Sequence, residues 1–568
     1  MTLIPPRRDV EPTRARTGAP PAPRRLATAL SLLAAVLAGA SVAVLALGPR
    51  ILDTGDIGWM LHGPLGPDPV AYWLAWTFFR HAPWTLPPGL NPEYGLELAS
   101  AIFYVDVVPL LALPLKALRD VVRVEQYWGP WLVACGALQA GFAWRLIGLA
   151  TRDPLARAAG AALFAFQPMM INRMGGHFAL VAHFVLIAGL FLCLRDATGR
   201  RQGLAWIVLL GAAALINAYL LAMTAALWGA DLVARAWREG RIAARAGEAI
   251  GVAAAVASGL WLSGFFSLAG PLKPLGPGYG ATGLDLLAPF DPVEWGSLLP
   301  ALPGLRHWEH GGSYLGAGSF LLVGAALVAL ATARLAWRAA LARHALLLAA
   351  LLAMLAFAVT NRIAIAGEVI AEFPLPATVQ HYADLLRASE RFVWPLAYAT
   401  LFAALAAVAA RWGARRARLV LLAALALQIA DVQGGLARYR ALVADAPRAP
   451  VERLADPFWG EAARHYQRVR AVPAGNFGAH WEEIARYAAL HGLATDSIYH
   501  SRVDRTALRR LRMAVIAELD AGRWEPGTLY VLRDEASIAI VAARFDPSRD
   551  LLRRVDGLMV FAPGWRAR

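Results

Sequence analysis

The sequence predicts a mainly α-helical fold: a polytopic membrane bundle of about eleven transmembrane helices, followed by a small C-terminal α/β domain. Three observations lead to this prediction. Hydrophobic residues make up 58% of the 568 residues, and the mean hydropathy is +0.48. Apolar runs long enough to cross a bilayer recur along the chain. Short arginine-rich segments separate these runs, as is typical of cytoplasmic loops.

The net charge of +15 could indicate a nucleic-acid partner, but the distribution of charge argues against one. Because the basic clusters alternate with apolar runs, they form no single basic face. We therefore expect membrane lipids as partners and no nucleic acid. Arginines are concentrated in residues 1–25, 145–157, 195–201, 235–245, 334–343 and 411–418.

The first segments of the chain set its orientation. Residues 1–25 are rich in Pro and Arg and predict a disordered cytoplasmic N-terminus. The apolar run 26–48 is too long for a signal-peptide core and predicts an uncleaved first span. The transmembrane domain, residues 26–433, contains further predicted spans at 127–149, 154–171, 178–194, 203–219, 220–237, 248–269, 315–335, 344–365, 392–410 and 417–433.

This set of spans places every arginine cluster on the cytoplasmic side. Residues 49–126 then form a first outer loop, and 434–568 an extracytoplasmic domain. The stretch 98–118 is apolar enough to cross, but it contains Asp106, Pro109 and Pro114. Crossing there would move every later arginine cluster outside, so we expect this stretch to lie in, or dip into, the outer interface.

The C-terminal domain is predicted from a change of composition after Asp431. Residues 434–568 carry mixed charges and have the pattern of a small α/β domain. We expect helices at 481–491 and 506–519 and short strands at 528–533 and 537–543.

The stretch "GPDPVAYWLAWTFFRHAPW", residues 66–84, predicts a short helix in the outer interface. Asp68 precedes a proline and suits the N-cap position. The helix must end before Pro83 and is too short to cross ~30 Å of hydrocarbon. Its tyrosine and tryptophans, Tyr72 among them, are typical of a membrane interface.

Three acids could carry chemistry on this outer side. Asp68 is either a helix cap alone or also an ionised carboxylate available as a base or metal ligand. Asp56, in "LDTGD", could be a turn residue or a second acid. Asp106 lies in an apolar run, where a carboxylate is costly and needs either a function or a local hydrogen bond.

Cationic groups are predicted on the same outer side. Arg173 and His177, in "NRMGGHFALVAHF", could hold an anionic headgroup, or they could form a Gly-Gly turn with a snorkelling arginine. Arg391, in "RASERFVW", could clamp a phosphate or pair with Glu390. His183 follows His177 by a spacing that does not suit a zinc site.

Asp68 followed by Tyr72 resembles the pattern of the GT-C superfamily of integral-membrane glycosyltransferases. In that superfamily an Asp early in the first outer loop starts a helix that has a Tyr about four residues on. The chain also resembles a bacterial family of GT-C-like polytopic membrane proteins that has no firmly assigned activity. The matching pieces are "DPVAYWLAWTFFRHAPW", "GLNPEYGLELASAIFYVDVVPLLALPLK", "RMGGHFALVAHF", "SERFVW", "GTLYVLRD" and "DGLMVFAPGW".

Two positions depart from the pattern of that family. Pro67 stands where a glycine is expected before Asp-Pro, and "NAY" at 217–219 stands where His-Pro-Tyr is expected. The second departure removes a histidine from that place, and with it any histidine role there.

The resemblance implies a glycosyltransferase of the bacterial inner membrane. It would transfer a sugar from a polyprenyl-phosphate donor to an envelope glycan, lipid or protein. Asp68 would be the base or would position a divalent cation, Mg or Mn, and Asp56 or Asp106 would be a second acid. Substrate-binding groups would be Tyr72, Arg80, Arg173, His177 and Arg391.

Two other functions remain open from the residues alone. A non-catalytic protein that binds or exports a lipid-linked glycan would share the basic and aromatic lining but need no essential acid. A small-molecule transporter would carry ionisable or helix-breaking residues at mid-span, whereas the acids here lie mostly at the outer edge.

Overall fold

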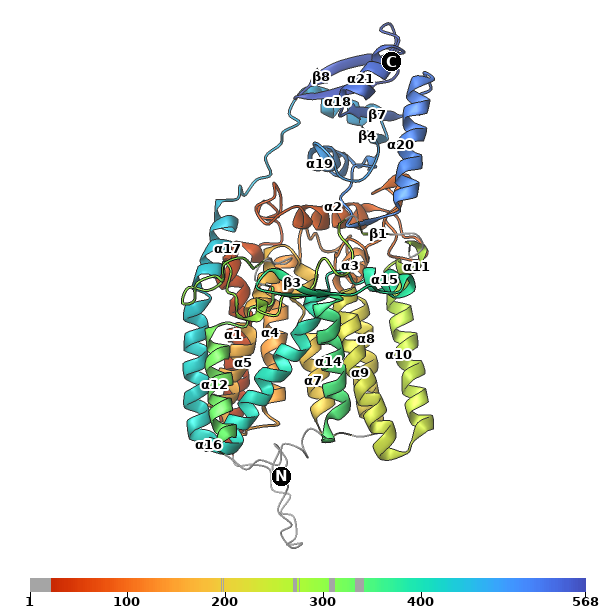
Figure 1. Ribbon diagram of the computed structural model, residues 1–568. Coiled ribbons are helices and arrows are strands. Elements are labelled where there is room, and N and C mark those ends of the chain that lie inside the picture. Colours follow the sequence, from red (N-terminus) through yellow and green to blue (C-terminus); the bar gives the residue numbers. More distant parts are fainter. Residues whose placement is uncertain are drawn as a thin grey trace. The chain divides into compact units, whose positions relative to one another are not determined.

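The computed structural model describes residues 22–195, 197, 199–268, 273–274, 276–305, 312–332 and 342–567 (Figure 1). Most of the predicted disordered N-terminus lies outside these residues. The chain divides into two compact units. We call residues 1–53, 127–256 and 277–445 the helical unit, and residues 54–126, 257–276 and 446–568 the sheet unit.

The helical unit contains a helix at every position where the sequence predicts a span. Its α-helices are α1 (Ala22–Leu47), α4 (Trp128–Ile147), α5 (Pro154–Ala165), α6 (Pro168–Ile171), α7 (Phe184–Leu194), α8 (Arg200–Ala214), α9 (Ala218–Glu239), α10 (Ile242–Leu262, whose end belongs to the sheet unit), α12 (Ala317–Ala331), α14 (Ala345–Val359), α15 (Ala377–Asp384), α16 (Trp394–Asp431) and α17 (Gln433–Asp445). Its shorter elements are η1 (Pro49–Leu52), η3 (Asn172–Gly175), η4 (Phe178–Val181), η5 (Ala288–Phe290) and η6 (Ser389–Val393), with the antiparallel hairpin β2 (Arg362–Ile365) and β3 (Glu368–Glu372).

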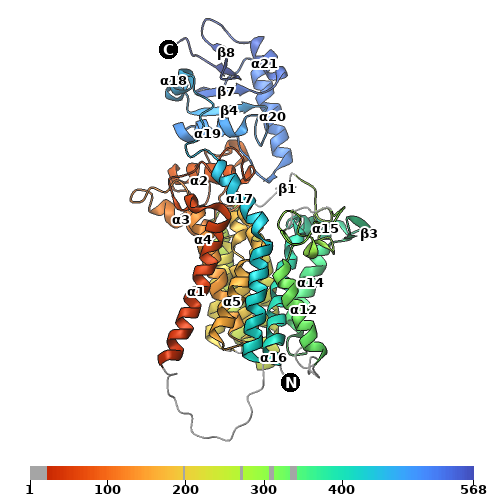
Figure 2. The same ribbon diagram turned by 90° about the vertical axis from the view of Figure 1, so that its left-hand side faces the viewer.

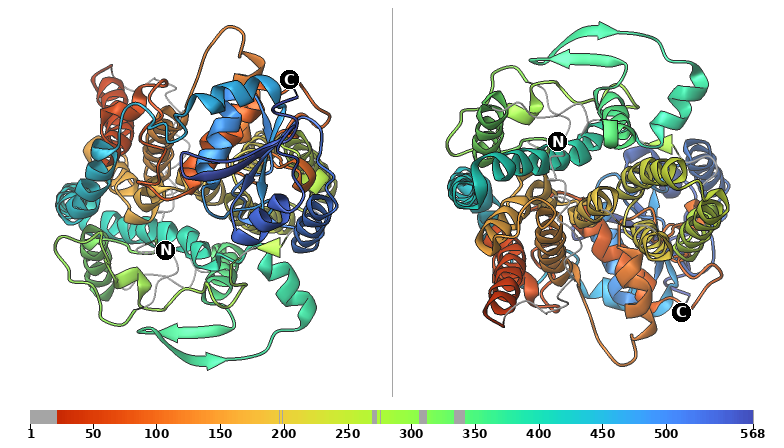
Figure 3. Two further views of the ribbon diagram at one scale, coloured as in Figure 1. Left: turned by 90° about the horizontal axis from the view of Figure 1, so that it is seen from above. Right: turned by 90° about the horizontal axis from the view of Figure 1, so that it is seen from below.

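Close backbone packing joins the first two long helices of this unit, α1 and α4, which lie side by side in Figure 2. A Cβ added to Gly39 would meet the carbonyl oxygen of Gly136 at 2.1 Å, and one added to Gly136 would meet that of Gly39 at 2.2 Å. Small residues at such crossings are typical of helix pairs in membranes, where close backbone contact replaces the hydrophobic effect. Figure 3 shows the helices end-on, with the β2–β3 hairpin outside them.

Three helices are long and apolar enough to span a membrane: Arg25–Leu47, Ile242–Leu262 and Ser389–Asp431. Shorter apolar helices occur at Pro154–Ala165, Phe178–Leu194, Ala317–Ala331 and Ala345–Val359. The chain therefore has the helices of a membrane-associated protein. The longest candidate is interrupted at Gly413, whose φ of 75° suits glycine, and this break separates the two spans predicted at 392–410 and 417–433.

The sheet unit is built on a five-stranded mixed sheet of order β5-β4-β7-β9-β8. β4 is parallel to β5 and β7, and β9 is antiparallel to β7 and β8. The bounds are β4 (Arg468–Val472), β5 (Ala494–Thr495), β7 (Thr528–Leu532), β8 (Leu551–Val555) and β9 (Leu558–Ala562); a separate pair joins β1 (Lys273–Pro274) to β6 (Arg502–Val503). The helices are α2 (Asp68–His81), η2 (Leu96–Leu98), α3 (Pro109–Ala117), α11 (Phe265–Leu268), α18 (Pro457–His465), α19 (Trp481–His491), α20 (Arg505–Asp520) and α21 (Glu535–Ala542).

One sequence-based expectation for this domain is wrong. The predicted helices at 481–491 and 506–519 are present as α19 and α20, and β7 confirms the strand at 528–533. The predicted strand at 537–543 is instead the helix α21. The carboxylate of Asp534 accepts a hydrogen bond of 2.8 Å from the backbone N–H of Ser537, and this N-cap starts a helix in an otherwise ambiguous apolar run.

The first outer loop of the predicted topology is part of the sheet unit. The backbone N–H of Gly95 donates to the carbonyl of Thr495 (2.8 Å), and the N–H of Thr495 donates to the carbonyl of Glu93 (2.9 Å). The Arg470 guanidinium on β4 pairs with Glu97 at 2.6 Å. Residues 54–126 thus fold together with 446–568, whereas α17 belongs to the helical unit.

Candidate functional site

The helix that carries Asp68 is a buried element of the sheet unit. α2 begins at Asp68, so Pro67, and not the predicted Asp68, occupies the N-cap position. Every residue from Pro69 to Arg80 is buried, and Tyr72 is only 4% exposed. α19 packs against α2 within the unit. The prediction of a helix exposed to the membrane interface is therefore wrong, because protein covers its aromatic residues.

Arg80, at the end of α2, is engaged in structural contacts. Its guanidinium donates to the carbonyl of Val124 at 2.7 Å and pairs with Glu125, while its own carbonyl accepts a bond of 2.8 Å from Arg119. These contacts attach the segment 119–125 to α2. The predicted contact of Arg80 with a substrate stays a prediction.

A lysine that the sequence reasoning missed lies beside this helix end. The ammonium of Lys116 is 4.0 Å from the centroid of the Phe79 ring and 4.8 Å from that of Trp84. It donates to the carbonyl of Pro83 at 3.2 Å. Burial and the neighbouring Arg119 lower the pKa of Lys116 to about 8.

Asp56 has the contacts of a turn residue. Its carboxylate accepts a hydrogen bond of 3.1 Å from the backbone N–H of Gly58, and its carbonyl accepts one of 3.1 Å from the indole of Trp59. The side chain is buried, with 8% exposure. An aspartate side chain that accepts a hydrogen bond from the backbone two residues further on is common in turns.

Asp106 lies in a strained loop. Asp106 (φ 48°) and Val108 (φ 52°) both adopt the left-handed backbone region, as do Leu96 (φ 49°) and Ala99 (φ 53°) earlier in the same loop. Each such non-glycine residue costs about 1–3 kcal/mol, and residues of this kind cluster at functional sites. We call residues 96–108 the strained loop. Its backbone conformation makes Asp106 a stronger candidate for a functional acid than its position in the sequence did.

Arg173 lies in the helical unit, on η3. It is 2% exposed, and its guanidinium donates to the side-chain oxygen of Asn172. The guanidinium carbon is 5.9 Å from the ring centroid of Trp394, at the start of α16. His177 is half-buried, and its backbone N–H donates to the carbonyl of Arg173 at 2.9 Å.

Arg391 lies on η6, three residues before Trp394, and is 7% exposed. Its guanidinium carbon is 4.6 Å from the ring centroid of Tyr219, a distance typical of a cation–π contact. The hydroxyl of Tyr219 accepts a bond of 3.2 Å from the backbone N–H of Ala388. Arg173, Tyr219, Arg391 and Trp394 form what we call the arginine–aromatic cluster.

Two family models match this chain. Residues 36–433 match the model described as "Domain of unknown function (DUF6311)", and residues 458–563 match the "DUF6311 C-terminal domain". The chain belongs to the DUF6311 family. A comparison with curated proteins finds no match.

In this DUF6311 chain the sequence reasoning missed a buried polar chain next to the arginine–aromatic cluster. The imidazole of His183 lies 4.2 Å from the Trp394 ring, centroid to centroid, and its Nδ1 is 2.9 Å from the hydroxyl of Tyr398. Gln139 donates to the same hydroxyl at 2.9 Å. All of these side chains are fully buried. Polar residues inside apolar runs were the only signal that could have found them.

From the sequence, Tyr219 was considered only as the last residue of "NAY", residues 217–219. The side chain of Asn217 caps α9 by accepting the backbone N–H of Tyr219 at 2.9 Å. The cap fixes the start of α9 and therefore the position of the tyrosine. Asn217 thus makes a defined contact where the family pattern would have a histidine.

The predicted site residues of the DUF6311 chain are divided between its two units. Asp56, Asp68 and Asp106 belong to the sheet unit, and Arg173, His177 and Arg391 to the helical unit. Within the helical unit, Arg173 contacts the ring of Trp394, and Arg391, three residues before Trp394, contacts the ring of Tyr219. Among the described residues, no group of three or more His, Cys, Asp or Glu side chains is placed to hold a metal ion.

Proposed function

We propose that this chain is an inner-membrane glycosyltransferase of the GT-C type. It would transfer a sugar from a polyprenyl-phosphate donor to an envelope glycan, lipid or protein. The observation that carries the proposal is the arginine–aromatic cluster, in which two almost fully buried arginines contact aromatic rings. Guanidinium groups held in this way are suited to phosphate, because their planar donor edge matches two phosphate oxygens.

The proposal includes the topology expected from the sequence. About eleven spans would place the N-terminus in the cytoplasm and the sheet unit outside. The close packing of α1 against α4 supports this arrangement, because it is typical of helices in a membrane. The break at Gly413 also supports it, because it divides α16 into two helical segments, as two separate spans require. A lipid-linked donor would then reach the helical unit from the outer leaflet.

In the proposed reaction, the acceptor hydroxyl attacks the anomeric carbon of the donor sugar. The bond between that carbon and the phosphate oxygen breaks, and polyprenyl phosphate leaves with the electron pair. By the resemblance to GT-C enzymes, Asp68 is assigned as the base that takes the proton of the acceptor hydroxyl. Arg173 and Arg391 stabilise the charge that develops on the leaving phosphate.

The remaining predicted residues have secondary roles in this proposal. Asp106, in the strained loop, is the second acid, and His177 supports Arg173. Tyr72 is buried and helps to fix α2. Among the described residues, no three His, Cys, Asp or Glu side chains are grouped so that they could hold a divalent cation.

A transfer assay on the full-length protein in nanodiscs tests the proposal. A panel of radiolabelled polyprenyl-phosphate hexoses and pentoses is offered with envelope extracts as acceptors, and released polyprenyl phosphate is measured. The variants are Asp68→Asn and, as a matched control, Asp120→Asn, which removes one charge from an exposed carboxylate of the same unit.

We expect Asp68→Asn to lose transfer by roughly 10²–10⁴-fold, the range for removal of a general base, and Asp120→Asn to keep it. Full transfer by Asp68→Asn would refute the assigned base. If the wild-type protein binds a donor but releases polyprenyl phosphate with none of the acceptors, the protein is a binding or export component instead.

A further inference from the structure

The helical unit contains a second feature, separate from the arginine–aromatic cluster: a cavity of about 380 Å³ between the end of α7, the C-terminal half of α9 and the start of α14. Its volume lies within the range of small-ligand sites, roughly 300–1,000 Å³. The basic side chains on its wall are Arg195, Arg238, Arg343 and His344. Among the residues that the structure describes here, the acid on the wall is Asp231.

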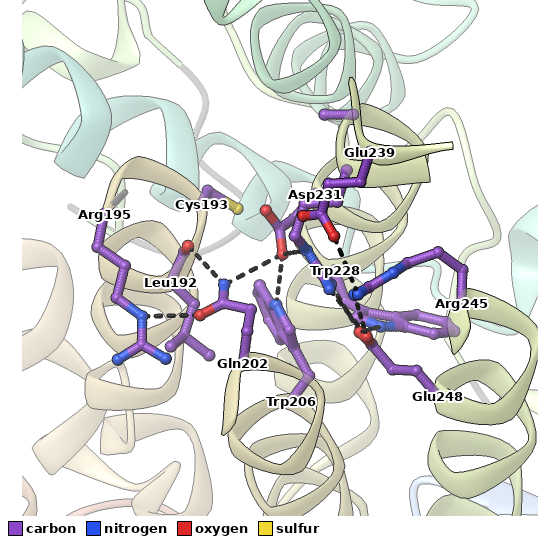
Figure 4. Close-up of polar contacts among 12 residues, drawn as sticks. Leu192, Cys193, Arg195, Gln202, Trp206, Trp228, Asp231, Glu239, Arg245 and Glu248 are labelled. Atoms are coloured by element: carbon purple, nitrogen blue, oxygen red, sulfur yellow. Dashed lines mark hydrogen bonds and ion pairs between the residues drawn. The ribbon is translucent and has the colours of Figure 1, made fainter. Parts of the chain in front are cut away.

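The carboxylate of Asp231 is already compensated by neighbours (Figure 4). It accepts hydrogen bonds from the indole of Trp206 at 2.7 Å and from the side chain of Gln202 at 3.2 Å, and it pairs with Arg235 at 2.7 Å. It is 5% exposed. Asp231 therefore shares its charge with Arg235, and the three arginines and His344 leave the wall predominantly basic.

The same network positions one of the cavity arginines. Gln202 accepts a hydrogen bond of 2.7 Å from the Nε of Arg195 and donates one of 2.8 Å to the carbonyl of Leu192. Arg235, which also pairs with Asp231, makes two bonds to Glu248, of 2.8 and 2.6 Å. Arg245 adds a bond of 2.8 Å to the same carboxylate (Figure 4). Arg195 is thus held at the wall by a frame that is itself fixed by ion pairs.

The start of α14 adds a favourable field for an anion. His344 is the N-cap of this 15-residue helix, and the cavity is lined by the residues from 342 to 347. The first backbone N–H groups of a helix and the positive end of its dipole favour negative charge. The cavity therefore combines three arginines with a helix N-terminus.

An apolar rim accompanies this basic wall. Trp237 lines the cavity and is 83% exposed, and Val233, one helical turn earlier on α9, is 50% exposed. Residues four apart lie on the same helix face. A basic pocket beside exposed apolar side chains matches a phospholipid, whose phosphate and acyl chains are joined in one molecule.

We propose that this cavity binds the phosphate-bearing headgroup of an anionic phospholipid. Arg238 and Arg343 hold the phosphate together with Arg195, and Val233 and Trp237 contact the acyl chains. The arginines of the cavity come from clusters that the sequence places on the cytoplasmic side, so the lipid is one of the inner leaflet. The site does not depend on the proposed glycosyltransferase function.

Lipid binding by the full-length protein in detergent tests this proposal. Native mass spectrometry measures retention of three probes: phosphatidylglycerol, phosphatidylcholine and inorganic phosphate. The variants are Arg238→Gln and Arg343→Gln, both at exposed positions where the fold should tolerate the change. Arg241→Gln is the matched control, since Arg241 is exposed in the same region but does not line the cavity.

We expect phosphatidylglycerol to bind more tightly than phosphatidylcholine and each cavity variant to weaken it roughly fivefold, as about 1 kcal/mol per basic residue implies. The double variant should lose roughly 30-fold if the two effects add, and Arg241→Gln should lose less than about twofold. Equal binding of the two lipids, or equal binding by all variants, overturns the proposal. Binding of inorganic phosphate without phosphatidylglycerol overturns the lipid assignment.

Discussion

Removal of Arg235 should destabilise the helical unit strongly. Arg235 is 1% exposed and makes one bond to Asp231 and two to Glu248, at 2.6–2.8 Å. Arg235→Met would leave the buried carboxylate of Asp231 without the guanidinium it pairs with, while Glu248 would keep its bond to Arg245. Removing one partner of a buried ion pair costs about 3–5 kcal/mol, because the charge that remains is uncompensated.

This cost corresponds to a fall in melting temperature of roughly 6–20 °C, at about 2–4 °C per kcal/mol for a large domain. The assay is size-exclusion chromatography of the detergent-solubilised protein after heating, with Arg241→Gln as an exposed control. A double variant, Arg235→Met with Asp231→Leu, should recover much of the loss, since the unpaired carboxylate of Asp231 is then removed and Glu248 keeps its bond to Arg245. If Arg235→Met and the control Arg241→Gln have equal melting temperatures, the network does not stabilise the helical unit as assigned.

Three further predictions concern packing, pH and capping. Gly39→Ala should lower the melting temperature, because its Cβ would meet a backbone oxygen on α4, at a cost of about 1–3 kcal/mol. Gly324→Ala on α12, where nothing lies within 4 Å, should leave the melting temperature unchanged or higher, and equal effects of the two would contradict the close crossing. Burial lowers the pKa of His500 from 6.5 to about 4, so the unfolded state binds a proton that the folded state does not. The stability that His500 contributes should be complete above pH 6.5 and fall by at most about 3 kcal/mol towards pH 4. Hydrogen exchange of β4 and β7 checks this dependence, which His500→Phe should reduce. Asp534→Ala should cost about 1 kcal/mol and increase exchange in α21 before other helices; uniform protection would rule out a local cap.

Much of the helical unit could be predicted from the sequence, because each apolar run specifies its own helix. The break at Gly413 was predicted as a gap between two spans, since the arginines around it interrupt the hydrophobic run. Local signals of this kind require no knowledge of the partner that a helix packs against.

In the sheet unit, several features depend on tertiary packing and could not be predicted from local sequence. Aromatic residues suit both a membrane interface and a protein core, and one of the elements that pack on α2, the helix α19, lies hundreds of residues later. In the strained loop, non-glycine residues such as Val108 adopt the left-handed backbone region. No glycine at these positions indicates that conformation in the sequence. The contacts of Arg80 with Val124 and Glu125 also depend on tertiary packing, which the local sequence does not show. Without them in sight, Arg80 was predicted to bind a substrate.

The arginine–aromatic cluster was predicted in part. Arg391 stood out because positive charge on the outer side departs from the usual bias, and Arg173 because it could hold an anionic headgroup there. Their aromatic partners did not, because Tyr219 and Trp394 lie at helix starts in runs that read as ordinary apolar sequence. Only the fold brings these four side chains into one cluster.

Donor binding and sugar transfer measured side by side on Asp68→Asn test the central claim most directly. We expect the variant to retain the wild-type dissociation constant for a polyprenyl-phosphate sugar but to release little polyprenyl phosphate when acceptor is added, because only the base is lost. Release at the wild-type rate by Asp68→Asn, or no acceptor-dependent release by the wild-type protein with any donor, would contradict it.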